Sequence, residues 1–169
     1  ELHQSRIKAS VPFAQSIQDS VRGLEMPYAL FEVSVEETQL SQAGKDAVAF
    51  RFSATGRNPI DVAKCASGGE MSRIMLALKD MMSRFSKMPT MIFDEIDTGV
   101  SGSVADKMGS MICGMGQNMQ VFAITHLPQV AAKGSAHYLV EKHVSADSKP
   151  VSTIRRISGE ERELEVARM

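Results

Sequence analysis

The sequence predicts an α/β fold in which a mostly parallel sheet is flanked by helices. Residues 89–93 form an apolar run that leads into the adjacent carboxylates Asp94 and Glu95. Residues 121–125 form a second apolar run that leads into His126. The segments before and between these runs place apolar residues three and four apart, as one face of a helix does. Buried strands that alternate with helices and end in polar residues are typical of the ligand-bearing edge of a parallel sheet.

The N-terminal segment, residues 2 to about 24, predicts a helix. Its apolar or small residues recur at the three-and-four spacing of a seam between two helices, at Ile7, Ser10, Ala14, Ile17, Val21 and Leu24. Pro12 conflicts with an unbroken helix, because proline removes one backbone hydrogen bond and clashes with the preceding turn. We therefore expect a kink, or a helix that starts near Val11.

Four further segments alternate apolar and polar residues, as half-buried strands do. Residues 30–36 and 48–54 predict one antiparallel pair, joined through a polar segment. Residues 137–142 and 151–157 predict two more strands. Residues 159–169 predict a terminal helix.

The segment around Ser67 predicts an anion-binding loop. Ser67, Gly68 and Gly69 directly precede a helix whose apolar stripe comprises Met71, Ile74, Met75, Leu78, Met81, Met82 and Phe85. Free backbone N–H groups converge at a helix N-terminus, and glycines let a phosphate approach the main chain closely. Taken alone, the same residues also fit a flexible loop with a serine cap.

The strand-end residues also have a simple alternative interpretation. Asp94 and Glu95 could be a solvated turn, and His126 could be a polar residue satisfied by its neighbours. Their shared place at the carboxyl ends of two strands favours a site, because such ends meet at one edge of the sheet.

The order of these motifs resembles the second half of an ABC-type ATPase, with a signature loop, a Walker B strand and a switch histidine. More closely, residues 66–79, 93–102 and 125–132 resemble the RecN family of SMC-like bacterial DNA repair proteins. The resemblance implies the C-terminal lobe of an ABC/SMC-type P-loop NTPase head. Residues 1–24 would end an antiparallel coiled-coil arm, and residues 25–169 would form the lobe.

The resemblance also implies ATP and Mg²⁺ as cofactors and gives each candidate residue a role. Asp94 would hold Mg²⁺ through water, Glu95 would polarise the attacking water, and His126 would sense the γ-phosphate. These roles agree with the preference of Mg²⁺ for oxygen ligands and with the need of an attacking water for an acceptor. The residues expected to contact ATP held by the opposite head are Ser67, Gly68, Gly69 and Glu70.

Residues 96–102 resemble the D-loop, which couples the two sites of an ABC dimer. Many relatives carry Asp where this chain has Ser101. Either Asp97 or Ser101 could therefore perform the coupling here. Ser101 or Ser103 could equally cap the next helix, whose predicted apolar stripe is Val104, Met108, Met111, Ile112 and Met115.

A nucleotide-binding loop of the type Gly-x-x-x-x-Gly-Lys-Ser/Thr is absent from the sequence. We therefore expect the chain to be a C-terminal piece of a longer protein. It would need the N-terminal Walker A lobe of that protein to bind ATP, would form a homodimer through ATP-bound heads, and would be inactive alone. By resemblance, the full-length protein would act on DNA in double-strand break repair by recombination.

Composition limits the remaining choices. The net charge of −1 argues against a chain-wide basic face, so DNA contact would be local or lie in other parts of the protein. The sequence has two cysteines, no signal peptide and no apolar run that would span a bilayer, which predicts a cytoplasmic protein without membrane contact. The resemblance to RecN proteins implies that it is nucleoid-associated. The alternatives are another SMC-like or transporter-type ABC head and a non-catalytic interaction module.

Overall fold

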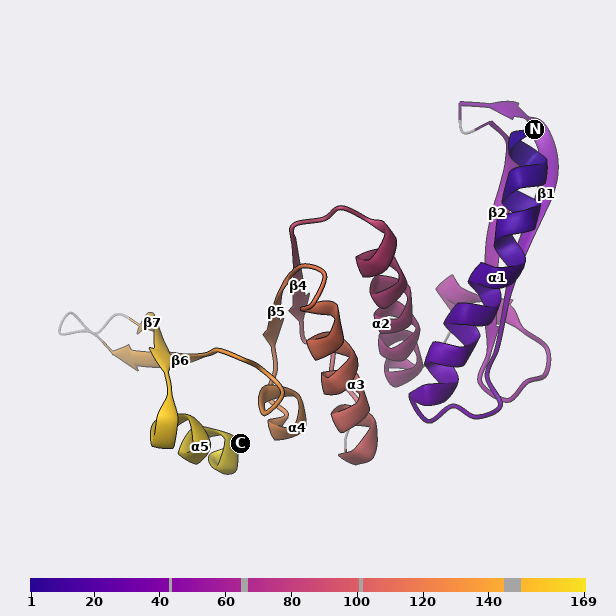
Figure 1. Cartoon of the computed structure of the whole chain (residues 1–169). Helices are drawn as coiled ribbons and strands as arrows, with labels where there is room; N and C mark the ends of the chain where they lie inside the picture. Colours follow the sequence, from indigo (N-terminus) through magenta and orange to yellow (C-terminus); the bar gives the residue numbers. More distant parts are fainter. Residues whose placement is uncertain (43, 65–66, 101, 145–149) are drawn as a thin grey trace.

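A computed structural model describes residues 1–42, 44–64, 67–100, 102–144 and 150–169 (Figure 1). The elements in chain order are α1 (Leu2–Gly23), β1 (Leu30–Ser41), β2 (Gly44–Ser53), β3 (Ile60–Asp61), the 3-10 helix η1 (Val62–Lys64), α2 (Gly68–Phe85), β4 (Thr90–Asp94), α3 (Gly102–Met115), β5 (Gln120–Ile124), α4 (Pro128–Ala131), β6 (His137–Val144), β7 (Pro150–Ile157) and α5 (Gly159–Arg168). The predicted α/β class is confirmed, with a parallel strand pair, flanking helices and additional antiparallel strands.

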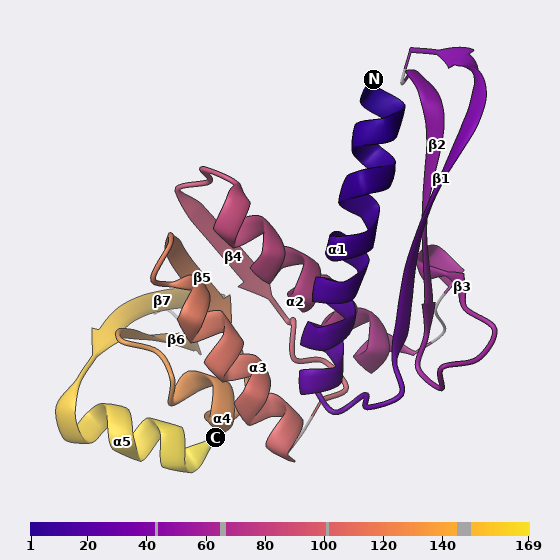
Figure 2. The same cartoon turned by 45° about the vertical axis from the view of Figure 1, so that its right-hand side comes forward.

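Helix α1 lies along the β1–β2 hairpin, as the views in Figures 1 and 2 both show. The helix runs from Leu2 and includes Pro12, so the expected start near Val11 is wrong. At the far end of the hairpin, Arg6 and His3 contact the carboxylate of Asp46. These contacts tie the first turns of the helix to β2.

The β1–β2 pair is antiparallel, as predicted, and pairs Leu30 with Ser53 at its base. Both strands extend further than the alternating pattern indicated, to Ser41 and from Gly44. The extra residues are mostly polar and mostly exposed, and backbone pairing extends to Glu37 opposite Asp46 and resumes at Ser41 opposite Gly44 after an irregularity. The short strand β3 pairs with β2. It was not predicted from the sequence, because two residues are too few for a periodic signal.

Helix α2 lies between two hydrophobic clusters. Ile74 and Ala77 join a cluster with α1 and the β1–β2 hairpin, whereas Leu76 joins a cluster with α3 and β4. The predicted single stripe is therefore only partly correct. Met82 and Phe85, which belong to that stripe, are exposed.

Strands β4 and β5 are parallel, with Thr90 opposite Gln120 and Asp94 opposite Ile124. Helices α2 and α3 cover one face of this pair, where Met91 and Phe93 are buried (Figure 1). The other face is open to solvent. Its apolar side chains keep large exposed fractions, at Ile92 (61%), Phe122 (43%) and Ile124 (56%).

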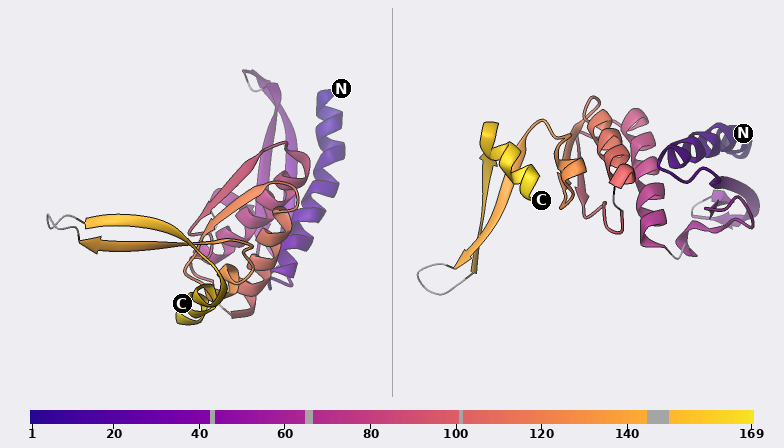
Figure 3. Two further views of the ribbon diagram at one scale, coloured as in Figure 1. Left: turned by 60° about the vertical axis from the view of Figure 1, so that its left-hand side comes forward. Right: turned by 90° about the horizontal axis from the view of Figure 1, so that it is seen from below.

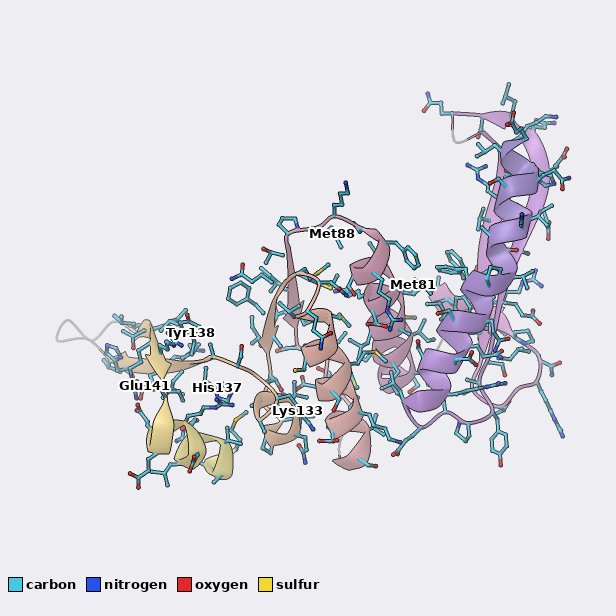
Figure 4. The ribbon with its side chains drawn as sticks, viewed as in Figure 1. Met81, Met88, Lys133, His137, Tyr138 and Glu141 are labelled. Carbon is cyan, nitrogen blue, oxygen red and sulfur yellow. The ribbon has the colours of Figure 1, made fainter. Side chains whose placement is uncertain are left out.

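The C-terminal part consists of the β6–β7 hairpin and α5, and the hairpin projects away from the helices (Figures 1 and 3). Figure 4 shows Tyr138 and Glu141 on β6 and His137 where that strand begins. Arg155 of β7 binds both Glu141 and Glu161, which links the hairpin to α5. In the part of the chain that the structure describes, every helix is too short or too polar to cross a bilayer.

Candidate functional site

The N-terminus of α2 has the geometry expected of an anion-binding loop. Ser67 caps the helix, and its Oγ accepts a hydrogen bond from the N–H of Glu70 at 3.4 Å. The N–H groups of Gly68 and Gly69 have no acceptor among the described residues. Because Ser67 and Gly68 are exposed, an anion from outside can reach these donors.

The predicted signature loop (residues 67–70) touches the predicted D-loop (residues 96–102, of which 101 lies outside the described residues). A Cβ atom added to Gly69 would lie 3.1 Å from the carbonyl oxygen of Gly99. Gly99 itself has a φ of +74°, a conformation that side chains disfavour. Glycine at both positions therefore permits the close approach of two loops that are far apart in the sequence.

Arg73 connects the signature loop to the end of α1. Its Nε donates a hydrogen bond to the carbonyl oxygen of Gly69 at 2.9 Å. Its Nη1 donates to the carbonyl oxygen of Leu24 at 3.3 Å. One guanidinium group thus bonds to the loop and to the segment that follows α1.

Asp94 and Glu95 stand at the carboxyl end of β4, and both are exposed. Glu95 has a φ of +50°, where a residue with a Cβ atom is strained by about 1–2 kcal/mol. Its carbonyl oxygen accepts hydrogen bonds from the N–H of Thr98 at 3.2 Å and from the Thr98 hydroxyl at 2.9 Å. This turn holds the strained backbone and directs the chain into the D-loop.

Asp97 lies beneath that turn with an exposed fraction of 0%. The hydroxyl of Thr125 donates a hydrogen bond to Asp97 Oδ2, and the N–H of Leu127 donates to Thr125 Oγ1 at 3.0 Å. His126 Nδ1 lies 3.8 Å from Asp97 Oδ1, although the His126 side chain is 70% exposed. The D-loop is therefore bonded to the segment that carries the histidine.

The structure brings most of the predicted site residues into one region. Because Asp94 lies opposite Ile124 in the parallel pair, Asp94, Glu95 and His126 follow neighbouring strand ends. The contact between Gly69 and Gly99 attaches the signature loop to the same D-loop. Ser101 lies outside the described residues.

Magnesium is compatible with Asp94, but only with help from other ligands. No group of three His, Cys, Asp or Glu side chains in the described ranges is placed to hold a metal ion. Mg²⁺ commonly takes one or two carboxylates together with waters and phosphate oxygens. The single exposed carboxylate of Asp94 at the strand end fits that kind of site.

Two hollows in the surface lie away from these residues. One lies between α1 and β1 and is lined by Gln18, Phe31 and Arg51, among others. The second is lined by residues that include Asp80 of α2 and Lys107 of α3. Neither is lined by a predicted site residue.

Three residues of this region were not singled out from the sequence: Arg73, Gly99 and Thr125. Thr125 had the clearest available signal, because it is a polar residue directly before the candidate histidine. The contacts of Gly99 and Thr125 join residues about thirty positions apart, which a local pattern cannot reveal.

Solved structures define the class of fold. The Smc head domain with a coiled coil and joint derived from Pyrococcus yayanosii is similar with a TM-score of 0.72 and 20% identity, over 92% of this chain and 28% of that one. A second structure, from work on the ATP-driven dimerization and DNA stimulated activation of SMC ATPases, is similar with a TM-score of 0.68 and 16% identity, over 98% of this chain and 95% of that one. The chain has the fold of the C-terminal lobe of an SMC-type head domain.

The particular relatives are bacterial. The DNA repair protein RecN of Rickettsia conorii is 37% identical over 171 residues, covering 99% of this chain and 31% of the relative. RecN of Haemophilus influenzae is 38% identical over 171 residues, covering 99% of this chain and 30% of the relative. The chain corresponds along its whole length to the C-terminal part of RecN and spans about 30% of the length of these relatives. A search of family models found no match.

Proposed function

We propose that the chain is the C-terminal half of an ATPase head that binds ATP and Mg²⁺ at the interface between two heads. The N-terminal lobe of the same protein would supply the Walker A loop, and the chain alone would be inactive. One observation carries the proposal: the signature loop and the strand-end carboxylates are joined through the D-loop, yet both face solvent. Each needs a partner from outside the described residues to form a closed site.

The hydroxyl of Ser67 remains available to a phosphate despite its structural role. A serine hydroxyl can accept two hydrogen bonds and donate one. Capping by the N–H of Glu70 uses only an acceptor position of Oγ. The O–H donor and the N–H groups of Gly68 and Gly69, which have no acceptor within the described part of the chain, can therefore bind the γ-phosphate oxygens of ATP held by the opposite head.

The strand-end residues would supply the chemistry of hydrolysis. Asp94 would hold Mg²⁺ through water, and Glu95 would orient and polarise the attacking water. His126 would donate a hydrogen bond to the γ-phosphate. The positive φ of Glu95 supports a functional role, because strained backbone persists where the surrounding structure enforces it and is concentrated at such sites.

The open face of the parallel pair supports an N-terminal lobe as a partner. Ile92, Phe122 and Ile124 form an exposed apolar surface on that face. In addition, β5 pairs only with β4, and β6 only with β7, among the described residues. An adjoining lobe would bury the apolar surface and could add strands at these edges.

The outer half of α1 supports the proposal that residues 1–24 end a coiled-coil arm. Leu2 and Val11 are exposed apolar residues on this part of the helix, and Ile7 is partly so. A second helix would cover them. The inner half is different, because Ile17 and Val21 are buried in the core with β1 and α2.

The RecN relatives support a role in DNA repair. We propose that ATP-driven closing and opening of the heads serves double-strand break repair by recombination. The full-length protein, rather than a basic face of this chain, would contact DNA, since the chain has a net charge of −1.

The proposal is tested by replacing Glu95 with Gln in the full-length protein. ATP-dependent dimers should persist while the hydrolysis rate falls at least about 100-fold, because the amide lacks the charge and basicity with which the carboxylate would polarise the attacking water. Glu32→Gln, on the exposed part of β1, is the matched control and should leave turnover unchanged. Unchanged turnover in Glu95→Gln would favour the non-catalytic interaction module, and ATP hydrolysis by the isolated chain would contradict the composite site.

A further inference from the structure

The carboxylate of Asp97 is buried, but only one of its two oxygen atoms accepts a hydrogen bond among the described residues. Oδ2 accepts the hydroxyl of Thr125, whereas Oδ1 has no hydrogen-bond partner among the described residues. A buried charge of this kind is costly unless a donor is close. His126 Nδ1 lies 3.8 Å from Oδ1 and is a candidate donor.

We propose that Asp97 is a positioning residue that holds His126 by its Nδ1–H and thereby presents Nε2 to the nucleotide. The inference rests on the proposed function, in which His126 contacts the γ-phosphate. It also gives the buried carboxylate a role within its own subunit. With no exposed surface, the Asp97 side chain cannot contact a second subunit in this conformation.

The tautomer follows from the chemistry of the two groups. A neutral imidazole has one nitrogen that donates and one that accepts, and a carboxylate only accepts. Facing Asp97 Oδ1, His126 must therefore carry its proton on Nδ1. Nε2 is then the nitrogen left for the ligand, and it donates to phosphate when the ring takes up a second proton.

A short movement of the His126 ring would complete a hydrogen bond from His126 Nδ1 to Asp97 Oδ1. An N–H···O bond has a length of about 2.7–3.2 Å, so the present 3.8 Å must close by roughly 0.6–1.1 Å. The exposed ring of His126 has room to make that movement when ligand binds. Asp97 itself is already fixed, because Thr125 donates to Oδ2 and is held in turn by the N–H of Leu127.

Asp97→Asn provides the decisive variant, because it keeps the size of the side chain. If the amide oxygen keeps the bond from Thr125, the NH₂ group faces His126 Nδ1 and makes that nitrogen an acceptor. The proton of the neutral ring should then move to Nε2. The readout is the pattern of long-range ¹H–¹⁵N couplings of ¹⁵N-histidine in the full-length protein, with His126→Gln to assign the signal.

The wild type should show the Nδ1–H form of His126, and Asp97→Asn should show the Nε2–H form with an unchanged thermal midpoint. Thr125→Ser keeps the hydroxyl and should keep the wild-type tautomer, which is informative even if Asp97→Asn folds poorly. The same tautomer in wild type and folded Asp97→Asn, or an Nε2–H ring in the wild type, would overturn the inference.

Steady-state kinetics give a second readout. Asp97→Asn should lower kcat for ATP about 10- to 100-fold, because a neutral ring would then donate to the phosphate in place of the charged ring that the Asp97 carboxylate holds, with KM within about twofold of wild type. A raised KM with unchanged kcat would contradict a positioning role. If the proposed function is wrong, His126→Ala should leave the rate of ATP hydrolysis unchanged. The tautomer of His126 then still tests whether Asp97 holds the histidine ring.

Discussion

The backbone of Glu95 predicts an unusual response of stability to glycine. At a φ of +50°, a residue with a Cβ atom is strained by about 1–2 kcal/mol, whereas glycine is not. Glycine loses more backbone entropy than alanine on folding, by about 0.5–1 kcal/mol in regular structure. We therefore expect Glu95→Gly to be more stable than Glu95→Ala by about 1 kcal/mol.

Comparing glycine with alanine removes the carboxylate in both variants and leaves the backbone as the difference. Glu70, in the first turn of α2, provides the opposite control because its backbone is helical. There glycine should be less stable than alanine, by up to about 1 kcal/mol. The sign of the difference between glycine and alanine should reverse between the two positions.

The assay is equilibrium unfolding in urea, followed by circular dichroism, on the four variants. For a protein of 150–250 residues, 1 kcal/mol corresponds to about 2–4 °C in the thermal midpoint, which gives an independent measurement. If glycine at position 95 were no more stable than alanine, the strain assigned to this turn would be refuted. The more stable Glu95→Gly should still lack ATP hydrolysis in the full-length protein, so the strain would be retained for function rather than for folding.

Two further predictions concern the signature loop and the β1–β2 hairpin. Gly68→Ala should be neutral or stabilising by up to about 1 kcal/mol, because open space surrounds the new Cβ, whereas Gly69→Ala should be less stable than Gly68→Ala because its Cβ lies 3.1 Å from the Gly99 oxygen. Both should weaken ATP-dependent dimerisation in sedimentation experiments, and dimerisation at wild-type strength would contradict close phosphate approach. The Arg6 guanidinium, and to a lesser extent His3, hold the pKa of Asp46 below its ordinary value of 3.8. A carboxyl group whose pKa is lower in the folded than in the unfolded state stabilises the fold fully at a pH above its unfolded-state pKa. This stabilisation is lost as the pH falls through the folded-state pKa. Asp46→Asn should therefore be less stable than wild type in urea at pH 7, and the gap should shrink below about pH 3.8; a gap independent of pH would exclude this ion pair as its cause.

Features set by neighbouring residues could be predicted from the sequence. The serine cap of α2, which the sequence offered as the alternative to an anion-binding loop, depends only on Ser67 and the N–H three residues later, and it is present. The parallel pairing of β4 and β5 followed from two apolar runs with polar ends. Pro12 shows the limit of such rules, because burial of Ile17 and Val21 favours one continuous helix despite the local cost of proline.

Features set by distant residues could not be predicted. The hydrogen bond between Asp97 and Thr125 joins the segments that follow β4 and β5. It can be predicted only when the pairing and register of these two strands are known. The contact of Gly69 with Gly99 depends on how α2 packs on the sheet. The alternation rule also underestimated β1 and β2, whose outer halves are held by backbone pairing and not by an apolar face.

The two hydrogen bonds of Arg73 make the end of α1 and the loop at residues 67–70 mechanically dependent on each other. A guanidinium is flat and stiff, so its donors keep a fixed spacing. Any tilt of α1 that displaces the Leu24 carbonyl must either drag the Gly69 carbonyl along or break a bond. A displacement at the end of α1 would thus be passed to residues 67–70 through the two hydrogen bonds of one side chain.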